Sequence, residues 1–263
     1  MDTGPYCDLT VFTGRRYKGD LMEAPIVKPV VSPNTPKLGR AAVIVSSDSD
    51  IRLLDRSLGI GPDHYRPLFL SRLYPDPNRD TGFAVVGPAV GAPYAVMLLE
   101  TLIAWGATDF IFLGWCGAIE KGVTIGDIII PDRAFIDEGT SLHYGYQSGE
   151  ETVPDESWAR NLRQRMEASG LVCHRGGIWS TDAIYRETPT RVKHFQDKGA
   201  LAVEMEVSAL FAVGLHHRVR VTALLVVSDE LSDLTWRPGF KKDRFKNSRK
   251  TSCDTLVALC QRH

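Results

Sequence analysis

Two carboxylates stand on either side of Met205 inside the apolar run AVEMEVSALF (202–211). Charged side chains are almost never buried unless they are paired, so Glu204 and Glu206 need a physical reason to be there. One such reason is a sugar diol, because its paired hydroxyls donate hydrogen bonds to a carboxylate. Met205 would then cover the apolar face of a ribose ring. The alternative is a pair of structural ion pairs.

A third acid closes the most apolar segment of the chain, RVTALLVVSDE (220–230). Desolvation raises the pKa of a carboxyl group, so Asp229 could donate a proton near neutral pH. The alternative is that Ser228 and Asp229 cap the next segment, because Ser and Asp are both common N-cap residues.

Two glycine-containing turns carry further candidates. In GPAVGAP (87–93), Gly87 and Gly91 would let a ligand approach the backbone, and free N–H groups at a helix start favour anions. The turn lacks the GK[ST] of a Walker loop and does not match GxGxxG, so a plain tight turn is the alternative. FLGWCGA (112–118) contains Cys116, which would need a neighbouring base to act as a nucleophile. Nothing local supplies one, and this favours a buried structural cysteine.

Two polar segments have ordinary structural explanations. EGTSLHY (138–144) contains His143, and a lone histidine is more often structural than catalytic. KKDRFKNSRK (241–250) has six positive residues and one acid, which is typical of a solvated helical face. One of its lysines, or Arg237, could still reach over a pocket.

The composition narrows the class of protein. The chain has 31 basic and 32 acidic residues, and this balance disfavours a nucleic-acid binder. No apolar run approaches about 20 residues and no signal peptide is visible, so neither a membrane span nor secretion is expected. Five cysteines without CxxC spacing favour a reducing compartment over disulfides or a zinc site. We therefore expect a globular cytoplasmic protein without a metal.

The elements that must position these residues begin at Ala41. Before it, residues 1–40 are rich in proline and predict an extended arm. After it, apolar strands alternate with helices, which indicates an α/β sheet covered on both faces. The strands are expected at 41–45, 67–75, 82–87, 108–118, 123–132 and 220–230, with a strand and turn at 176–185. The helices are expected at 51–59, 93–107, 157–170 and 245–262, and segment 200–218 is expected to start as a strand and become a helix. In such sheets, sites form at the carboxyl ends of strands. The turns after AAVIV, FAVV, FIFL and ALLVV are therefore expected to line one pocket.

Taken in order, the motifs resemble those of the purine nucleoside phosphorylase and uridine phosphorylase superfamily. The resemblance runs from about Ala41 to Asp229 and covers GPAVGAP, the GxCGA turn at 114–118, the GD of IGDIIIP, EGTSLHY, STDAIY, VEME and VSD. It implies a single-domain three-layer α/β/α sandwich with a mixed central sheet over 41–263. It also implies a pentosyltransferase that cleaves a nucleoside through an oxocarbenium-like sugar, with inorganic phosphate as co-substrate and no organic cofactor. A homo-oligomer, either dimer or hexamer, is the implied assembly.

The resemblance also assigns roles to individual residues. Glu206 would bind the ribose hydroxyls, Met205 would line the sugar, and Glu204 would help shape the base side. Asp229 would protonate or hydrogen-bond N7 of a purine, and Ser228 would orient it.

The base preference rests on two turns. Ile184 and Tyr185 occupy the turn that carries the base-stacking aromatic in relatives, so stacking is expected from Tyr185. Uridine-cleaving relatives carry a Gln where this chain has Thr188, and the Ser-Asp pair is of the purine type. EGTSLHY is closer to the uridine branch. A purine is favoured, and a uridine-type phosphorylase stays an alternative.

The phosphate-binding turn departs from the pattern of the family. Phe112 and Trp115 stand where phosphorolytic relatives place an Arg and a hydroxyl, and an apolar pair offers an anion no charge-assisted hydrogen bond. Together with His143 they are assigned to the pocket wall. Phosphate would then need Arg52, the backbone at Gly87 and Gly91, and a basic residue of a neighbouring subunit.

Asp50 supports a different chemistry, because it falls close to the catalytic acid of water-using nucleosidases in the superfamily. A nucleoside phosphorylase is the first hypothesis and a phosphate-independent nucleosidase the second. A third is a non-catalytic nucleoside-binding or storage protein, motivated by the lost phosphate-turn Arg. The presence of both Glu206 and Asp229 weighs against it.

Overall fold

The computed structural model describes residues 24–59, 61, 64–75 and 83–260 of the 263-residue chain. The strands are β1 (Ala41–Val45), β2 (Arg66–Leu68), β3 (Ser71–Tyr74), β4 (Phe83–Gly87), β5 (Asp109–Ala118), β6 (Ile128–Asp137), β7 (Glu151–Thr152), β8 (Cys173–Thr181), β9 (Ala200–Glu204), β10 (Arg220–Glu230) and β11 (Arg237–Pro238). The helices are α1 (Asp48–Leu58), α2 (Ala92–Ala104), α3 (Glu156–Ala168), α4 (Pro189–Asp197), α5 (Val207–His217) and α6 (Asp243–Cys260), with short 3₁₀ helices η2 (Ser141–Tyr144) and η3 (Ile184–Arg186).

All of these strands belong to one mixed sheet. Their order is β11-β10-β6-β8-β9-β5-β1-β4-β3-β2, with β7 paired to β6. Strand β5 pairs in parallel with both β1 and β10, and antiparallel with β9. Because β10 also pairs with β6, the strands β5, β10, β6, β8 and β9 close into a ring. Strands β1, β4, β3 and β2 extend from β5 as an open sheet, and β11 and β7 add to β10 and β6.

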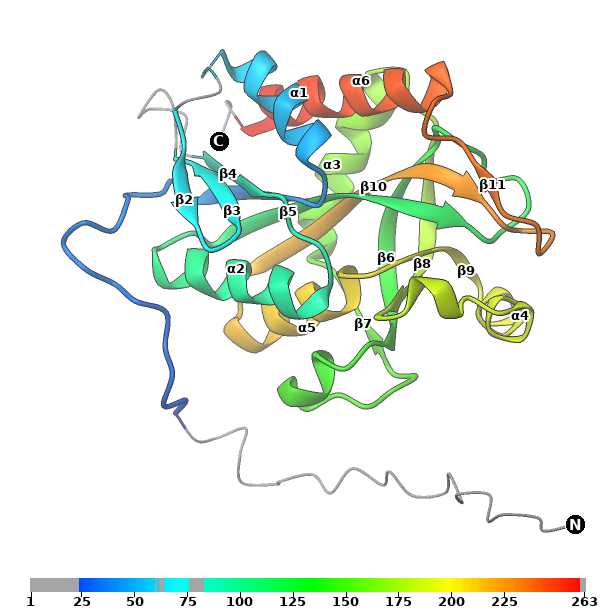
Figure 1. The fold of residues 1–263 in the computed structure, drawn as a ribbon, viewed down its shortest axis with the longest axis horizontal. Coiled ribbons are helices and arrows are strands. Elements are labelled where there is room, and N and C mark those ends of the chain that lie inside the picture. Colours follow the sequence, from blue (N-terminus) through cyan, green and yellow to red (C-terminus); the bar gives the residue numbers. More distant parts are fainter. Residues whose placement is uncertain (1–23, 60, 62–63, 76–82, 261–263) are drawn as a thin grey trace, which may run out of the picture.

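Helices cover both faces of the sheet (Figure 1). Helices α2 and α5 pack on one face, and α1, α3 and α6 pack on the other. Side chains alternate along a strand, so β1 sends Ala42 and Ile44 into one apolar core and Val43 and Val45 into the other. This confirms the predicted three-layer α/β/α arrangement around a mixed central sheet.

Several element boundaries differ from those predicted. Segment 67–75 is two strands, because Phe69 adopts a φ of 54° and turns the chain between β2 and β3. Helix α1 begins at Asp48, before the predicted residue 51, because the hydroxyl of Ser47 accepts a hydrogen bond from the N–H of Ser49. Helix α4 was not predicted, because its sequence is mostly polar.

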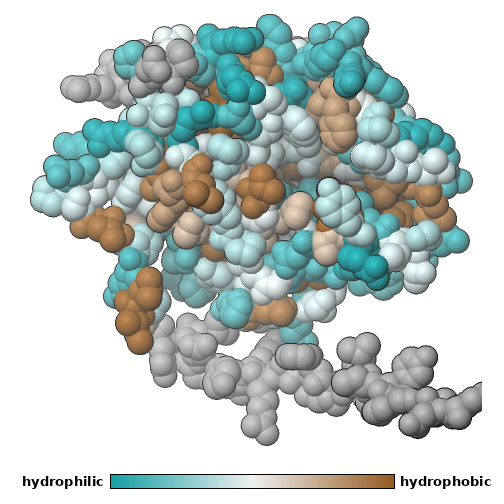
Figure 2. Space-filling model, viewed as in Figure 1, coloured by the Kyte–Doolittle hydropathy of each residue, from teal (hydrophilic) through white to brown (hydrophobic). Residues whose placement is uncertain are grey.

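The arm is described only from residue 24. Residues 24–40 contain no helix or strand, and the side chains of Ile26, Val27, Val30 and Val31 are exposed. Apolar side chains gather along this segment in Figure 2. The indole of Trp105, the residue directly after α2, donates a hydrogen bond to the carbonyl of Val30 at 2.9 Å. Residues 1–23 lie outside the described residues, so the division into an arm (1–40) and a domain (41–263) stays a prediction.

Candidate active site

A cavity of about 620 Å³ opens where β1, β5 and β10 end. Ser46 after β1 and Val90 after β4 form one part of its lining. Trp115 of β5 and Asp229 of β10 form another. Further walls come from the turn between β9 and α5, and from the chain between η3 and α4. The four turns singled out in the sequence therefore do line one pocket, as predicted.

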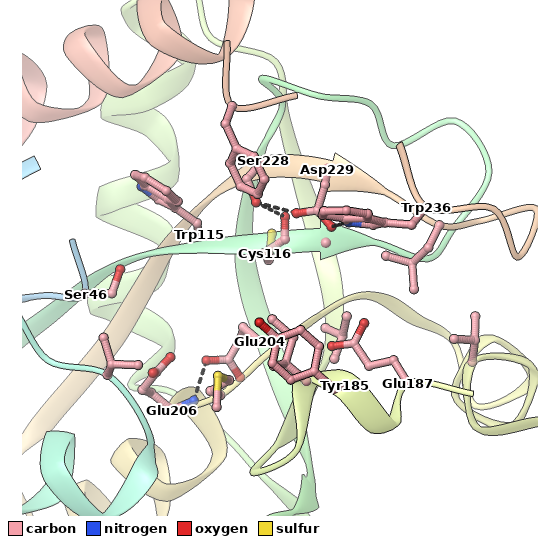
Figure 3. Close-up of a pocket in the computed structure, with 18 of the residues that line it drawn as sticks. Ser46, Trp115, Cys116, Tyr185, Glu187, Glu204, Glu206, Ser228, Asp229 and Trp236 are labelled. Atoms are coloured by element: carbon pink, nitrogen blue, oxygen red, sulfur yellow. Dashed lines mark hydrogen bonds between the residues drawn. The ribbon is translucent and has the colours of Figure 1, made fainter. Parts of the chain in front are cut away.

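The turn from β9 into α5 places Glu206 at one end of this cavity (Figure 3). Strand β9 ends at Glu204 and α5 begins at Val207, so the chain turns at the two residues between them. Glu206 is buried, and its Oε1 accepts a hydrogen bond at 2.6 Å from the backbone N–H of Gly91. Gly91 has a φ of 85°, a conformation that favours glycine. The N–H predicted to hold phosphate thus binds Glu206.

Glu204 lines the cavity but uses both of its oxygens within the protein. One oxygen accepts a hydrogen bond from the hydroxyl of Ser180. The other accepts from the backbone N–H groups of Glu206 and Val207, at 2.7 and 2.9 Å. These groups lie at the start of α5, so Glu204 caps that helix. Within the described part of the chain, neither glutamate forms an ion pair, so the alternative of two structural ion pairs is not observed.

Burial raises the pKa of both carboxyl groups. The pKa of Glu204 rises to about 7. That of Glu206 rises further, because the charge of Glu204 adds to the effect of burial. Both carboxyl groups are therefore protonated more readily than a free carboxyl group. A protonated carboxyl group can donate to one sugar hydroxyl while it accepts from another.

A β-bulge at the end of β10 positions the third acid. Val227 lies opposite Cys116 of β5, whereas Asp229 lies opposite Gly117, so Ser228 is an extra residue in the strand. The hydroxyl of Ser228 donates a hydrogen bond to Oδ1 of Asp229 at 2.5 Å. Gly117 leaves room for the carboxylate, because a Cβ there would lie 3.0 Å from Oδ2 of Asp229.

Trp236, which sequence reasoning missed, completes the surroundings of Asp229. Its indole N–H donates a hydrogen bond to Oδ2 of Asp229 at 2.8 Å. Phe240 stands beside it, with ring centroids 6.5 Å apart, and also lies 6.2 Å from the ring of Trp115. These three aromatic residues make one side of the cavity apolar. The sequence does offer a signal for this wall, because TWRPGF contains two aromatic residues a few positions after the Ser-Asp motif.

The opposite wall comes from η3 and the residues after it. Ile184 and Tyr185 line the cavity as the base-stacking prediction requires, with Tyr185 96% exposed. Glu187 lines it as well and was not predicted. Burial and the nearby negative charge of Asp229 raise the pKa of Glu187 to about 7. The sequence signal for this residue was the acid in RETPTR (186–191), a segment from which only Thr188 entered the prediction of base preference.

Asp50 does not line the cavity. It is buried, and its two oxygens accept hydrogen bonds at 2.6 Å from Nε of Arg249 and from Nε1 of Trp115. The guanidinium of Arg249 also lies over the Trp115 ring, 4.7 Å from its centroid. Burial raises the pKa of Asp50 by more than these partners lower it. Asp50 therefore supports the cavity wall from behind.

Arg52 lies outside the cavity too. Residues two apart on a helix are separated by about 200°, so Asp50 and Arg52 face opposite sides of α1. Arg52 is exposed and pairs with Asp48 at 2.5 Å, and Asp48 also pairs with Arg72. Gly87 is buried at the end of β4, where a Cβ would lie 2.5 Å from a carbonyl oxygen of β1. The close packing of β4 against β1 therefore explains why residue 87 is a glycine.

Of the other residues predicted for the pocket wall, some line the cavity and others do not. Trp115 lines the cavity, whereas Phe112 is buried in the core beneath α2 and α5. His143 is exposed on η2 and is not part of the lining. Cys116 does line the cavity, and burial raises the pKa of its thiol well above the usual range. That is the environment of a structural cysteine rather than a nucleophile.

The charged side chains in the described lining of the cavity are all acidic. Among the described residues around the cavity there are four acids and no Arg, Lys or His; the acids are Glu187, Glu204, Glu206 and Asp229. The described residues contain no group of three or more His, Cys, Asp or Glu placed to hold a metal ion. Nor does any helix in the described ranges have the length and apolar character to cross a bilayer.

Residues 61–261 match the phosphorylase superfamily, and the chain belongs to this family. It is 32% identical over 180 residues to a guanosine phosphorylase of Halorubrum lacusprofundi, covering 68% of this chain and 74% of that protein. It is 32% identical over 152 residues to a DeoD-type purine nucleoside phosphorylase of Bacillus cereus, covering 56% of this chain and 63% of that protein. The predicted superfamily is thereby confirmed.

A solved structure shows the same fold. The AMP nucleosidase from Bacteroides thetaiotaomicron superposes with a TM-score of 0.67 at 17% identity, over 86% of this chain and 92% of that one. The relatives found by sequence are named as phosphorylases, and the structural neighbour that shares the fold is named as a nucleosidase. The chain is an enzyme of the nucleoside phosphorylase and nucleosidase superfamily.

Proposed function

We propose that this enzyme cleaves the N-glycosidic bond of a purine nucleoside and transfers the ribosyl group to inorganic phosphate. One observation carries the proposal: a single cavity has a buried acid suited to sugar hydroxyls at one end and an acid suited to the base at the other. These acids are Glu206 and Asp229, and Figure 3 shows them on opposite sides of the cavity. Cleavage needs both, because the sugar must be held while positive charge develops and the departing base must be stabilised.

At the sugar end, Glu206 binds the ribose hydroxyls. Its Oε1 is held by the N–H of Gly91, and this fixes the carboxyl group in the cavity. Met205 lines the cavity next to it, and its thioether packs on the apolar face of the ribose ring. Glu204 contributes by capping α5, which keeps the turn that carries both residues in place.

At the base end, Asp229 protonates or hydrogen-bonds N7 of the purine. A positioned acid of this kind makes the base a better leaving group and contributes typically 10²- to 10⁴-fold. Ser228 and Trp236 each bind one oxygen of Asp229, so its orientation is set before the substrate arrives. Tyr185 is available to stack on the ring.

Phosphate as the acceptor is supported by the names of the relatives, a guanosine phosphorylase and a purine nucleoside phosphorylase. Ser46 and Ser47 line the cavity and offer hydroxyl donors to an anion. We expect a homo-oligomer in which a neighbouring subunit adds a basic residue, because the described lining of one chain has none. Arg52 is a further candidate only if its pair with Asp48 opens.

The same lack of a cation favours hydrolysis as a second candidate function. The ionised acids among the four around the cavity repel an anionic acceptor, whereas they do not repel water. In that reaction the Glu206 and Asp229 roles are unchanged, and free ribose is the product. Asp50 is a poor candidate for the base that activates water, because Arg249 and Trp115 occupy its two oxygens.

An assay of base release separates these functions. A panel of purine and pyrimidine nucleosides is incubated with the enzyme, with and without phosphate, and free base and sugar product are quantified. We expect purine release that saturates with phosphate. Phosphate-independent release with free ribose would establish the nucleosidase instead. Binding of nucleosides with no release under either condition would support the storage protein.

A further inference from the structure

Glu206 is the N-cap residue of α5, and its side chain does not cap that helix. The first N–H groups of an α-helix have no partner within the helix, and an N-cap side chain ordinarily accepts a hydrogen bond from the second or third helical residue. The carboxyl group of Glu206 instead accepts from the N–H of Gly91 and lines the cavity (Figure 3). Other residues therefore have to satisfy the start of α5.

Two residues of neighbouring strands supply these partners. Glu204, the last residue of β9, accepts from the N–H groups of Glu206 and Val207. Ser180 of β8 accepts from the N–H of Ser208 at 2.9 Å, and Ser208 is the second helical residue of α5. The hydroxyl of Ser180 also donates a hydrogen bond to Glu204. These contacts form a closed ring of hydrogen bonds around the first turn of α5.

The members of this ring are buried and fully committed to one another. Ser180 and Ser208 are 0% exposed, and Glu204 is 5% exposed. A hydroxyl group has a single hydrogen to donate, so Ser180 donates to Glu204 while its oxygen accepts from Ser208. A buried N–H group that loses its acceptor carries a desolvation penalty. Without the hydroxyl of Ser180, the N–H of Ser208 needs another acceptor, and the N-cap position makes Glu206 suited to provide one.

We propose that Ser180 is a positioning residue that caps α5 in place of Glu206 and so keeps this carboxyl group free for the sugar hydroxyls. The inference rests on the proposed function, in which Glu206 binds the ribose. Two donors compete for Glu206: the N–H of Gly91 holds it in the cavity, and the N–H of Ser208 would draw it back onto its own helix. Ser180 decides this competition because it occupies the second donor.

The test compares guanosine with 2′,3′-dideoxyguanosine, which lacks both ribose hydroxyls, in the wild-type enzyme and in Ser180→Ala. Once Glu206 turns to the N–H of Ser208, the loss of kcat/KM for guanosine should exceed that for the dideoxynucleoside by about tenfold. The dideoxynucleoside has no hydroxyls for Glu206 to bind, so its kcat/KM should change little. Ser180→Cys retains a side chain of similar shape with a weak donor and acceptor. It should show the same selectivity to a smaller degree, and it serves where the alanine variant does not fold.

Ser208→Ala is the matched control, because it also removes a buried hydroxyl that bonds to a buried glutamate. The hydroxyl of Ser208 donates to Oε1 of Glu138 at 3.0 Å, outside the ring. The variant keeps the backbone N–H that Ser180 caps. Its unfolding midpoint should fall at least as far as that of Ser180→Ala, whereas guanosine and the dideoxynucleoside should lose the same factor.

Two outcomes would overturn the inference. One is an equal loss for the two nucleosides in Ser180→Ala, since that is the result of a purely structural role. The other is a crystal structure of this variant in which Glu206 stays on the N–H of Gly91, because the inference predicts its carboxyl group on the N–H of Ser208.

Binding measured apart from turnover separates this inference from the proposed function. Calorimetry without phosphate gives the affinity of each nucleoside for the wild type and for Ser180→Ala. A preference for guanosine over the dideoxynucleoside that depends on Ser180, with no base release by the wild type under any condition, would support the positioning role and refute the proposed function.

Discussion

Replacing Asp50 by Asn tests whether this residue supports the cavity wall or takes part in the reaction. The side chain of Asp50 is 1% exposed and that of its partner Arg249 is 12% exposed. Removing one partner of a buried ion pair costs about 3–5 kcal/mol, because the remaining charge stays buried. Asparagine keeps one carbonyl oxygen, which still accepts from Arg249 or from Trp115. We therefore expect a loss near the lower limit, about 3 kcal/mol.

Urea unfolding measures this free energy, and thermal unfolding gives a second estimate. For a domain of this size, 1 kcal/mol moves the midpoint by about 2–4 °C, so Asp50→Asn should lower it by roughly 6–12 °C. Adding Arg249→Met should restore more than about 1 kcal/mol, because the unpaired charge is then gone. Asp243→Asn is the control on α6. Its side chain is 91% exposed in its pair with Lys246, so its loss should stay below about 1 kcal/mol.

Activity measured well below the unfolding midpoint supplies the other half of the test. Asp50 does not reach the cavity, so Asp50→Asn should change kcat by less than about tenfold through displacement of Trp115. A variant of normal stability that releases no base would refute the structural role and assign Asp50 to the chemistry.

Three other perturbations follow from the site. Asp229→Asn should lower kcat for purine release by about 10²- to 10⁴-fold with an unchanged unfolding midpoint, and a loss below tenfold would remove Asp229 from the mechanism. Gly117→Ala should also lower kcat, because its Cβ would lie 3.0 Å from Oδ2 of Asp229; kinetics equal to wild type would mean that this carboxylate has room to move. The pKa of Glu187 rises from 4.5 to about 7 on folding, so its contribution to stability is fully present below pH 4.5 and is lost as pH rises through 7. Urea midpoints at several pH values should show a shallower decline for Glu187→Gln than for wild type, and identical slopes would contradict the shift.

Much of the fold could be predicted because its buried strands are short, apolar and bounded by turn residues. Strand β10 has the predicted bounds, 220–230, since its sequence is apolar without interruption from Ala223 to Val227. The hairpin β2–β3 was missed because a single residue of positive φ, Phe69, interrupts an apolar run. Helix α4 was missed because only Val192 and Phe195 along it are buried.

The site was predictable where an acid sits inside an apolar run. Glu206 and Asp229 stood out for that reason, and the structure places both in one cavity. Trp236 and Glu187 belong to loops that the fold brings to the cavity, and no local pattern predicts such contacts. Arg52 was predicted for the site and lies outside it. Its position in a sequence motif does not indicate which face of α1 carries its side chain.

The most direct test of the proposed function is identification of the sugar product formed from guanosine. With the wild-type enzyme and millimolar phosphate, the account predicts guanine and ribose 1-phosphate in equal amounts, with no release when phosphate is removed. Formation of free ribose at the same rate in phosphate-free buffer would contradict it and identify a nucleosidase.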